Sequence, residues 1–294
     1  MSILSKTKVM KSNSFTTDEH KYLQRLKVLA LKPEIVYSIG ELPNKSQLSV
    51  AIVGTRRPTP YGKRVCFDFA YKLAQQGITI VSGLAYGIDK AAHEGALAAG
   101  GTTIAVLGHG LDTVYPAGHR KLAADIINNG GCLISEYEPG TPVMKHRFLE
   151  RNRIVAGLAD ALLVIEAGEK SGTSSTIQFA LEQNKEVFAV PGPIDSLLSA
   201  GTNRIIQQGA HPALSVQDIL AIIAPGAPIS DQPPTGATDV ESLLLSLIYK
   251  GVTENETLQA KSKLNPSDFA HTVTMLEIRG VIRREANGHW LLMA

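Results

Sequence analysis

The sequence predicts an α/β protein with a mostly parallel sheet, followed by a small separate module. From residue 48 onward, short apolar runs alternate with helical segments, and such runs are typical of strands buried on both faces of a parallel sheet. Several runs are followed directly by loops that contain glycine, as expected at the carboxyl ends of strands in such a sheet. Residues 224–238, rich in proline and glycine, then form a predicted linker to a module over residues 239–294.

The first part of the sheet region alternates strand and helix. The strands are predicted over residues 50–53, 78–81, 103–107 and 132–135, and the helices between them over residues 61–76, 89–99 and 119–129. Gly77 follows the first of these helices, at the position where glycine commonly ends a helix. Residues 1–45 are expected to lie before the sheet domain, as a mobile tail over residues 1–14 and a short helix over residues 18–30.

The next segment, residues 145–193, opens with a basic cluster. The cluster consists of Lys145, Arg147, Arg151 and Arg153 around one acid, Glu150, with Phe148 and Asn152 inside it. Strands are predicted over residues 161–165 and 186–190, joined by the loop 167–172 and a helix over residues 173–184. The loop amides and the helix N-terminus offer unpaired N–H groups to a phosphate oxygen, and Lys170 adds a positive charge beside them.

Loops at the carboxyl ends of parallel strands lie along one edge of the sheet, so we expect these loops to converge on a ligand. Several cations around loop amides suit a polyanion better than one small phosphate. Phe148 either stacks a base or packs in the core. Four other basic residues can be interpreted without DNA contact. Arg57 and Arg147 are expected to be solvated, and Arg151 or Arg153 can form an ion pair with Glu150 or Glu166.

Residues 239–294 predict a winged helix-turn-helix. Helices are expected over residues 239–249 and 255–261, and Asn265 and Pro266 begin a third, while residues 281–285 and 289–292 flank the hairpin turn Asn287-Gly288. The third helix carries a formal charge of about −1, which is unfavourable beside DNA phosphates. We therefore expect a protein or dimer contact here, or weak double-stranded DNA binding through Arg283 and Arg284.

Composition and motifs exclude several other classes of protein. The net charge is +2, so any basic surface must be local, and no apolar run approaches the ~20 residues of a membrane span. Cys66 and Cys132 lack metal or redox spacing and are expected to be buried, which suits the cytoplasm. Walker A and dinucleotide-binding glycine patterns are missing, so no cofactor is expected. No metal site is expected either, although His93 and His109 lie near the predicted cleft.

Taken together, the motifs resemble the DNA-processing protein A family (DprA, also called Smf). The resemblance rests on AIVGTRRPTPYG from Ala51, VSGLAYGIDKAAHEGAL from Val81, TIAVLGHGLDTVYP from Thr103, LISEYEPG from Leu133, RFLERNRIVAGLADALLVIEA from Arg147, KSGT from Lys170 and FAVPGP from Phe188. It implies an extended Rossmann-like domain, residues 46–223, that binds single-stranded DNA, forms a homodimer and is not an enzyme. It also implies that the protein protects incoming DNA and loads the RecA recombinase during natural transformation.

The resemblance also implies a set of DNA-binding residues. They are Gly54, Thr55, Arg56, Ser82, Gly83, Lys145, Phe148, Arg151, Asn152, Arg153, Lys170, Ser171, Gly172, Thr173 and Gly192. Thr55 stands where the family usually has serine, which keeps the hydroxyl. Leu149 stands where it usually has proline, and this change is expected to loosen the loop. The N-terminal helical domain of many members is expected to be absent or vestigial.

Two other functions fit parts of the sequence. Rossmann-like nucleoside-monophosphate phosphoribohydrolases have a glycine-rich P-G-G-x-G-T-x-x-E motif, but Thr176 stands here where they place the catalytic carboxylate. Their oxocarbenium-like chemistry needs a carboxylate near the sugar, and threonine supplies none. The hypothesis of a transcription factor would be supported by the predicted winged helix alone. Single-stranded DNA binding is therefore the leading interpretation.

Overall fold

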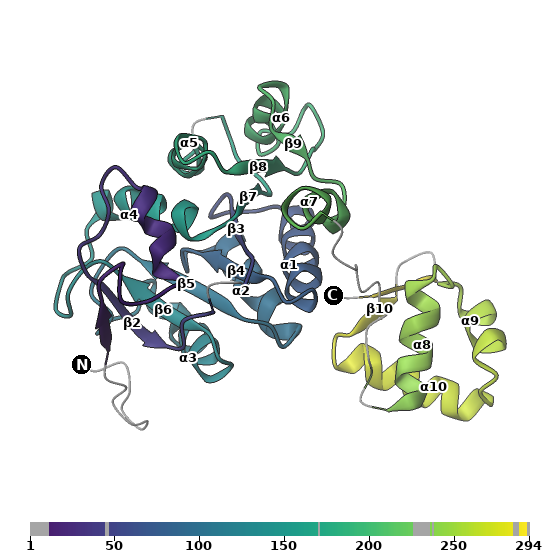
Figure 1. The fold of residues 1–294 in the computed structure, drawn as a ribbon. Helices are drawn as coiled ribbons and strands as arrows, with labels where there is room; N and C mark the ends of the chain where they lie inside the picture. Colours follow the sequence, from purple (N-terminus) through teal and green to yellow (C-terminus); the bar gives the residue numbers. More distant parts are fainter. Residues whose placement is uncertain are drawn as a thin grey trace. The chain divides into compact units, whose positions relative to one another are not determined.

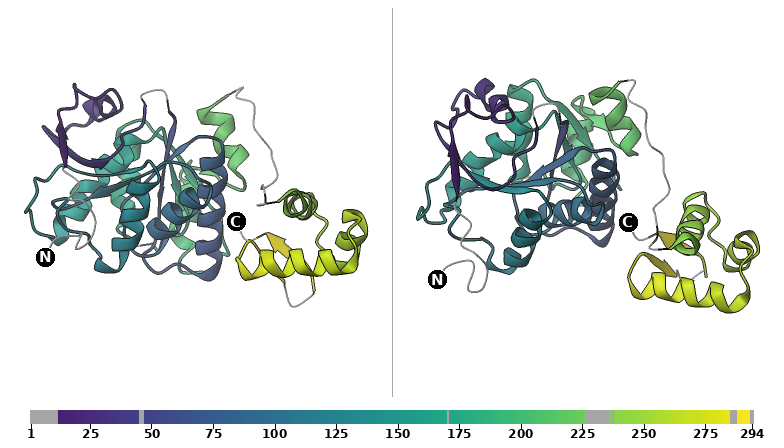
Figure 2. Two further views of the ribbon diagram at one scale, coloured as in Figure 1. Left: turned by 90° about the horizontal axis from the view of Figure 1, so that it is seen from below. Right: turned by 60° about the horizontal axis from the view of Figure 1, so that its bottom comes forward.

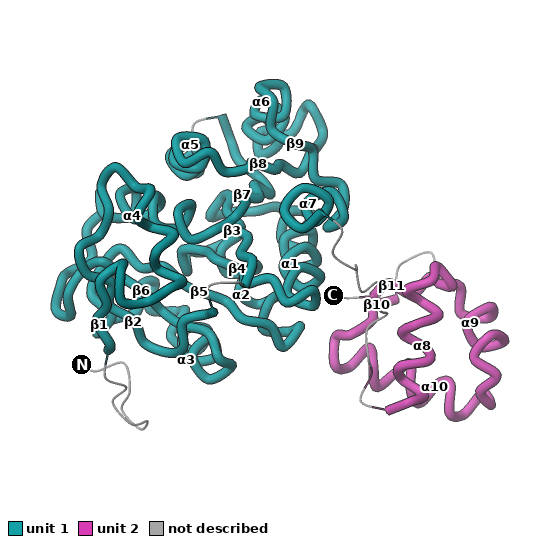
Figure 3. Tube along the Cα trace, in the orientation of Figure 1, with its two compact units in different colours: residues 1–227 teal, residues 228–294 magenta. Residues whose placement is uncertain are grey.

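The computed structural model describes residues 12–44, 47–169, 171–225, 236, 238–284 and 288–292. The chain divides into two compact units, residues 1–227 and residues 228–294, which we call the core unit and the C-terminal unit (Figure 3). The core unit has an α/β fold with a mostly parallel sheet, as the sequence predicts (Figure 1).

Within the described residues, one nine-stranded sheet runs through the core unit in the order β1-β2-β6-β5-β4-β3-β7-β8-β9. The strands are β1 Asn13–Phe15, β2 Val36–Gly40, β3 Ser49–Val53, β4 Thr79–Ser82, β5 Thr103–Leu107, β6 Cys132–Ser135, β7 Ala161–Val164, β8 Glu186–Ala189 and β9 His211–Pro212. Neighbours from β6 to β9 pair in parallel, whereas β2 pairs antiparallel with β6 and β1 antiparallel with β2.

The order of the strands reverses at β3. From β3 the chain adds β4, β5 and β6 on one side, and it then returns to place β7, β8 and β9 on the other. Val53 at the end of β3 lies opposite Val164 at the end of β7. The connections that leave β3 and β7 therefore diverge from neighbouring points, which creates a crevice at the carboxyl edge of the sheet.

Helices cover both faces of the sheet (Figure 2). One face carries α1 Pro60–Gln75, α2 Ile88–Ala98, α3 Arg120–Asn128 and α7 Val216–Ile223. The other carries the 3₁₀ helix η1 Leu23–Val28 and the helices α4 Lys145–Leu158, α5 Thr173–Glu182 and α6 Ala200–Gln207. A second 3₁₀ helix, η2 Ala117–His119, precedes α3. Because both faces are covered, the central strands are almost wholly apolar.

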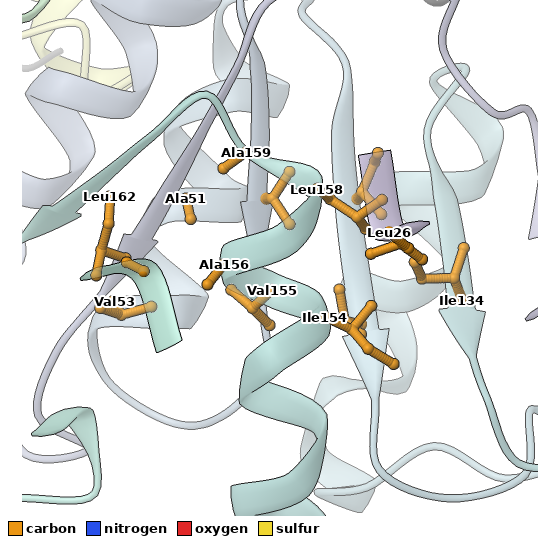
Figure 4. Close-up of a cluster of buried hydrophobic side chains, with 14 of the residues drawn as sticks. Leu26, Ala51, Val53, Ile134, Ile154, Val155, Ala156, Leu158, Ala159 and Leu162 are labelled. Carbon is orange, nitrogen blue, oxygen red and sulfur yellow. The ribbon is translucent and has the colours of Figure 1, made fainter. Parts of the chain in front are cut away.

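The C-terminal half of α4 lies in the hydrophobic core. Ile154, Val155 and Leu158 are almost fully buried there, together with Ala51 from β3 and Leu26 from η1 (Figure 4). Fully burying a side chain of this size contributes about 1.5–3 kcal/mol. This half of the helix is therefore fixed to the sheet, and it positions the polar N-terminal half.

The segment before β3 does not form a separate tail and helix. Residues 13–15 form β1, residues 36–40 form β2, and only residues 23–28 of the expected helix are helical. Tyr22 is fully buried and shares a hydrogen bond of 2.8 Å with the hydroxyl of Ser49. These contacts join the segment to the sheet, so the expected domain boundary near residue 46 does not match the sheet topology.

Two further differences from the prediction concern the start of α4 and the segment after β8. The basic cluster, expected to be part of a loop, forms the first turns of α4, so the expected loosening of a loop at Leu149 is wrong. The elements α6, β9 and α7 were not predicted. Ser215 and Asp218 form a capping box at the start of α7, which stabilises that helix locally.

The C-terminal unit contains the elements that the sequence predicts. They are α8 Asp239–Tyr249, α9 Asn255–Ser262 and α10 Pro266–Ile278, with the antiparallel strands β10 Ile282–Arg284 and β11 Trp290–Leu292. The Asn265 side chain accepts a hydrogen bond of 2.9 Å from the amide of Asp268 and so caps α10. Most of the predicted linker and Asn287 of the predicted turn lie outside the described residues. In the ranges that the structure describes, no helix has the length and apolar character needed to cross a membrane.

Candidate functional site

A cavity of about 780 Å³ lies where the strand order reverses. It is bounded by the loops after β3, β4, β5 and β7, the N-terminal half of α4 and the start of α5. Eleven of the residues predicted to bind DNA line it: Gly54, Thr55, Arg56, Gly83, Lys145, Phe148, Arg151, Asn152, Ser171, Gly172 and Thr173. Residues separated by more than 100 positions in the sequence are thus brought to one cavity.

Three predicted site residues lie elsewhere. Ser82 is fully buried and donates a hydrogen bond of 2.7 Å to the carbonyl of Ile52. Both Nη atoms of Arg153 donate to the carboxylate of Glu136 at 2.6 Å, so its ion-pair partner is neither Glu150 nor Glu166. The backbone of Gly192 is held by the side chain of Asn203.

These three residues support the fold around the cavity and do not line it. Lys170 lies outside the described residues.

Arg151 anchors α4 to the edge of the sheet. It is only 4% exposed, and its Nη1 donates hydrogen bonds to the carbonyls of Gly83, at 2.7 Å, and Val106. Burial lowers the pKa of its guanidinium to about 10, against the opposing effect of the Asp89 carboxylate. A side chain on Gly83 would place its Cβ 2.5 Å from Cζ of Arg151, so only glycine leaves room for this contact.

Asp89 is the acidic partner beneath the cavity. Burial raises the pKa of its carboxyl, an effect that the charge of Arg151 opposes. Its Oδ2 accepts hydrogen bonds from the amides of Gly83 at 3.1 Å and Ala85 at 3.2 Å. The floor of the cavity is therefore a structural network in which a buried cation and a buried acid hold two loops and α4 together.

Phe148 lies in the cavity wall and belongs to no buried apolar cluster of the described chain. Its ring centroid is 5.6 Å from that of Tyr115, and the two planes are tilted by 31°. The guanidinium carbon of Arg56 lies 5.7 Å from the same centroid. Of the two alternatives for Phe148, core packing does not fit this position, because the ring lies in the cavity wall. Tyr115 was missed, because a lone tyrosine in a loop gives no local signal of function.

Two cations lie at the rim of the cavity. Arg56 and Lys145 are both exposed, and each lines the cavity. Lys145 is the first residue of α4, whose first turn contains no acid. A cation at a helix N-terminus opposes the helix dipole at a cost of about 0.3–1 kcal/mol, so this position favours ligand binding over helix stability.

The other two cations near the rim differ from each other. Arg57 is exposed, as expected. Arg147 is half-buried and so less exposed to solvent than predicted. Its Nη1 donates a hydrogen bond of 2.8 Å to the carbonyl of Pro142. Its guanidinium carbon also lies 4.8 Å from the ring centroid of Tyr137. Arg147 is thus largely committed to neighbouring loops.

The loop before α5 is ordered by its own hydroxyl groups. Ser171 Oγ accepts a hydrogen bond of 3.2 Å from the amide of Thr173. Asn152 on α4 donates a hydrogen bond of 2.9 Å to Ser175 on α5, which ties the two helices together across the cavity. Thr176 is buried in the cavity lining.

The loop after β3 is packed against the end of β7. The amide of Thr55 donates a hydrogen bond of 2.8 Å to the carbonyl of Glu166, and a Cβ on Gly54 would lie 2.8 Å from the same oxygen. The carboxylate of Glu166 accepts hydrogen bonds from the amide and hydroxyl of Thr59 at the start of α1. The predicted ion pair between Glu166 and Arg151 or Arg153 is therefore not formed.

His93 and His109 do not reach the cavity lining. Both are fully buried, and burial lowers the pKa of His93 to about 3. His93 Nδ1 lies 2.7 Å from the hydroxyl of Thr103, within the core. Cys66 and Cys132 are buried, as predicted. Over the described part of the chain, no group of three or more His, Cys, Asp or Glu side chains could hold a metal ion.

Comparisons with known proteins agree with the resemblance in the sequence. The model of the family "DNA recombination-mediator protein A" matches residues 13–224. The putative DNA processing protein DprA of Mycobacterium tuberculosis is 37% identical over 270 residues, which cover 89% of this chain and 69% of that protein.

Two solved structures are also similar. DNA processing protein A of Streptococcus pneumoniae gives a TM-score of 0.67 at 38% identity, over 72% of this chain and 74% of that one. The Helicobacter pylori protein, whose structure describes a single-stranded DNA binding mode, gives 0.64 at 32% identity, over 75% of this chain and 96% of that one. With its characteristic loops gathered at one cavity, the chain belongs to the DNA recombination-mediator protein A family.

Proposed function

We propose that this protein binds single-stranded DNA, protects incoming DNA and loads the RecA recombinase onto it during natural transformation. The observation that carries the DNA-binding part is the cavity where the strand order reverses, because it combines exposed cations with aromatic rings. Single-stranded nucleic acid presents phosphates and unpaired bases together, and this combination of side chains suits both. The single-stranded DNA binding mode described for the Helicobacter pylori relative supports the same ligand.

The phosphate-binding part of the site consists of Arg56, Lys145 and the loop 171–173. Arg56 and Lys145 are exposed and line one cavity, so each can neutralise a phosphate without being buried. Residues 171–173 lead into the first turn of α5, whose dipole favours an anion at that end. Lys170 lies outside the described residues and stays a prediction from the sequence. Phe148 supplies an aromatic surface beside Arg56.

The role of the C-terminal unit follows from its charge. Arg279 pairs with Glu241 at 2.6 Å, and Asp268 is exposed on α10, so this helix presents little net positive charge. We propose that the unit is a winged helix that contacts a protein, with at most weak double-stranded DNA binding. We also propose that the protein acts as a homodimer in the cytoplasm.

A nucleoside hydrolase is the alternative, and no contact at the site favours it. Thr176 lies in the cavity where those enzymes place a carboxylate. The carboxylate that lines the cavity, Asp89, is already held by two backbone amides and faces the charge of Arg151. We propose that the protein does not release bases from nucleoside monophosphates, and assay of free base with purified protein tests this.

Fluorescence anisotropy with a labelled 20-mer of deoxythymidine tests the DNA-binding site. Arg56→Ala and Lys145→Ala should each weaken binding and reduce the slope of log K against log salt by roughly 0.7, as expected for one lost phosphate contact on a single strand. Arg64→Ala is the matched control, because Arg64 is exposed on α1 and does not line the cavity.

If both variants bind with the slope and affinity of Arg64→Ala, the site is wrong. RecA loading is tested separately. The rate at which RecA coats the same oligonucleotide should rise when the protein is added, and an unchanged rate would refute that part of the proposal.

A further inference from the structure

Tyr115 is an aromatic residue of the cavity that the proposed function does not yet use. It follows β5, and its side chain is 48% exposed and lines the cavity. Its ring lies 5.6 Å from that of Phe148, between centroids, with a tilt of 31°. A half-exposed ring in the wall of the cavity offers a flat apolar surface on which a π-stacked ligand can bind.

The ring faces of Phe148 are less accessible to a stacking base than those of Tyr115. Phe148 is half-buried, with the guanidinium carbon of Arg56 5.7 Å from its ring centroid. Its Cδ1 lies against the backbone of Gly108, where an added Cβ would be 3.3 Å away. A base held between Phe148 and Tyr115 would need about 7 Å between the rings, because each stacked contact takes about 3.5 Å. The observed 5.6 Å leaves no such gap. A base therefore does not fit between the two rings, and the face of Tyr115 turned away from Phe148 is left for stacking.

The backbone on both sides of Tyr115 is fixed. Val114 and Pro116 are buried, and the carbonyl of Pro116 accepts a hydrogen bond of 2.9 Å from the amide of His119. The His119 ring is in turn held by the carbonyl of Leu84, 2.9 Å from its Nδ1. An exposed ring on an anchored loop loses little conformational entropy when a ligand stacks on it.

We propose that Tyr115 binds a base of single-stranded DNA by stacking, with Phe148 packed behind it and Arg56 on an adjoining phosphate. This inference rests on the proposed function and adds the residue that receives the base. Stacking does not depend on hydrogen-bond patterns, because every base has a π face. Tyr115 should therefore raise affinity for all sequences alike.

Equilibrium anisotropy with a labelled deoxythymidine 12-mer tests the proposal. Tyr115→Ala should weaken binding about 5- to 150-fold, equivalent to the 1–3 kcal/mol of one stacked base, with the salt slope unchanged. Tyr115→Phe and Tyr115→Trp should stay within about threefold of the wild type. Tyr61→Ala is the matched control, because Tyr61 is 43% exposed and lies outside the cavity lining. Equal melting temperatures for Tyr115→Ala and the wild type confirm that the variant is folded.

A 12-mer of abasic sites keeps the phosphates and removes the bases. Tyr115→Ala should bind it as well as the wild type does, whereas Arg56→Ala should bind it less tightly. The chain has one tryptophan, Trp290, which is buried in the C-terminal unit. The new tryptophan of Tyr115→Trp should therefore give a separate signal that the deoxythymidine 12-mer quenches and the abasic 12-mer does not.

The outcomes separate this inference from the proposed function. If Arg56→Ala weakens binding while Tyr115→Ala binds the deoxythymidine 12-mer like the wild type, stacking on Tyr115 is refuted and single-stranded DNA binding stands. Stacking would also be refuted if Tyr115→Ala lost as much affinity for the abasic 12-mer as for the deoxythymidine 12-mer. If the wild type binds neither 12-mer, both proposals are refuted.

Discussion

Replacing Gly83 with alanine should weaken the anchoring of α4 at the edge of the sheet. The new Cβ would lie 2.5 Å from Cζ of Arg151, whereas carbon atoms in ordinary contact are about 3.5–4.0 Å apart. The guanidinium must therefore move by about 1 Å, which would stretch the 2.7 Å hydrogen bond to the Gly83 carbonyl beyond hydrogen-bonding distance.

The expected loss of stability follows from the bond to the Gly83 carbonyl. A hydrogen bond from a charged group contributes about 1.5–3 kcal/mol, so Gly83→Ala should lower the free energy of unfolding by about this amount. The smaller entropy of the unfolded alanine chain returns only about 0.4–1 kcal/mol. Because α4 carries Lys145 and Phe148, affinity for single-stranded DNA should fall as well.

Urea unfolding followed by circular dichroism measures the change. Gly118→Ala is the matched control, because its Cβ would lie 3.6 Å from the Tyr86 hydroxyl, an ordinary contact. That variant should be neutral or slightly stabilised. If the two variants differ by less than about 1 kcal/mol, a fraction of one such charged hydrogen bond, Arg151 does not anchor α4.

Three other predictions concern acid stability, the loop at Gly192 and the two units. Burial lowers the pKa of His93 to about 3, whereas the pKa of an unfolded histidine is about 6.5. Between these two pH values only the unfolded chain binds a proton at His93, so the free energy of unfolding falls as the pH falls. From pH 7 to pH 5 the wild type should lose about 2 kcal/mol more unfolding free energy than His93→Gln, and equal losses in urea titrations would contradict this. Gly192→Ala would place a Cβ 2.8 Å from that of Ser199, so we expect a loss of about 1–3 kcal/mol in unfolding free energy with unchanged DNA affinity in the folded fraction. Weaker DNA binding by folded Gly192→Ala would instead place this glycine in the site. Residues 1–227 alone should bind single-stranded DNA within tenfold of the full chain, about 1.4 kcal/mol, and a larger loss would assign binding to the C-terminal unit.

The parallel strands could be predicted because their signals are local. Strands β5 and β6 match the predicted residues 103–107 and 132–135, since each is a short apolar run next to glycine. The order of the loops along one sheet edge then predicts a shared cavity, and most of the expected residues do line it. Fold class and the approximate place of the site thus follow from periodicity and topology.

The roles of individual charged residues could not be predicted in the same way. Arg151 and Arg153 are neighbours in one basic cluster, yet one is anchored by backbone carbonyls of the loop after β4 and of β5, and the other pairs with Glu136. These partners come from distant parts of the chain, and arginine is rarely buried without them. The start of α4 has no apolar stripe because it leaves the core and projects over the edge of the sheet, so the cluster gives no helical pattern.

The two halves of α4 couple ligand binding to folding. Its C-terminal half is packed in the core, and its N-terminal half forms one wall of the cavity. A ligand held by Lys145 and Phe148 binds only while this helix is docked, so its binding free energy adds to the stability of the whole nine-stranded unit. At 100 times the dissociation constant, this linkage amounts to about 2.7 kcal/mol. Protection against proteolysis should therefore rise with DNA concentration even at peptide bonds far from the cavity, because unfolding of the core unit would first require release of the DNA.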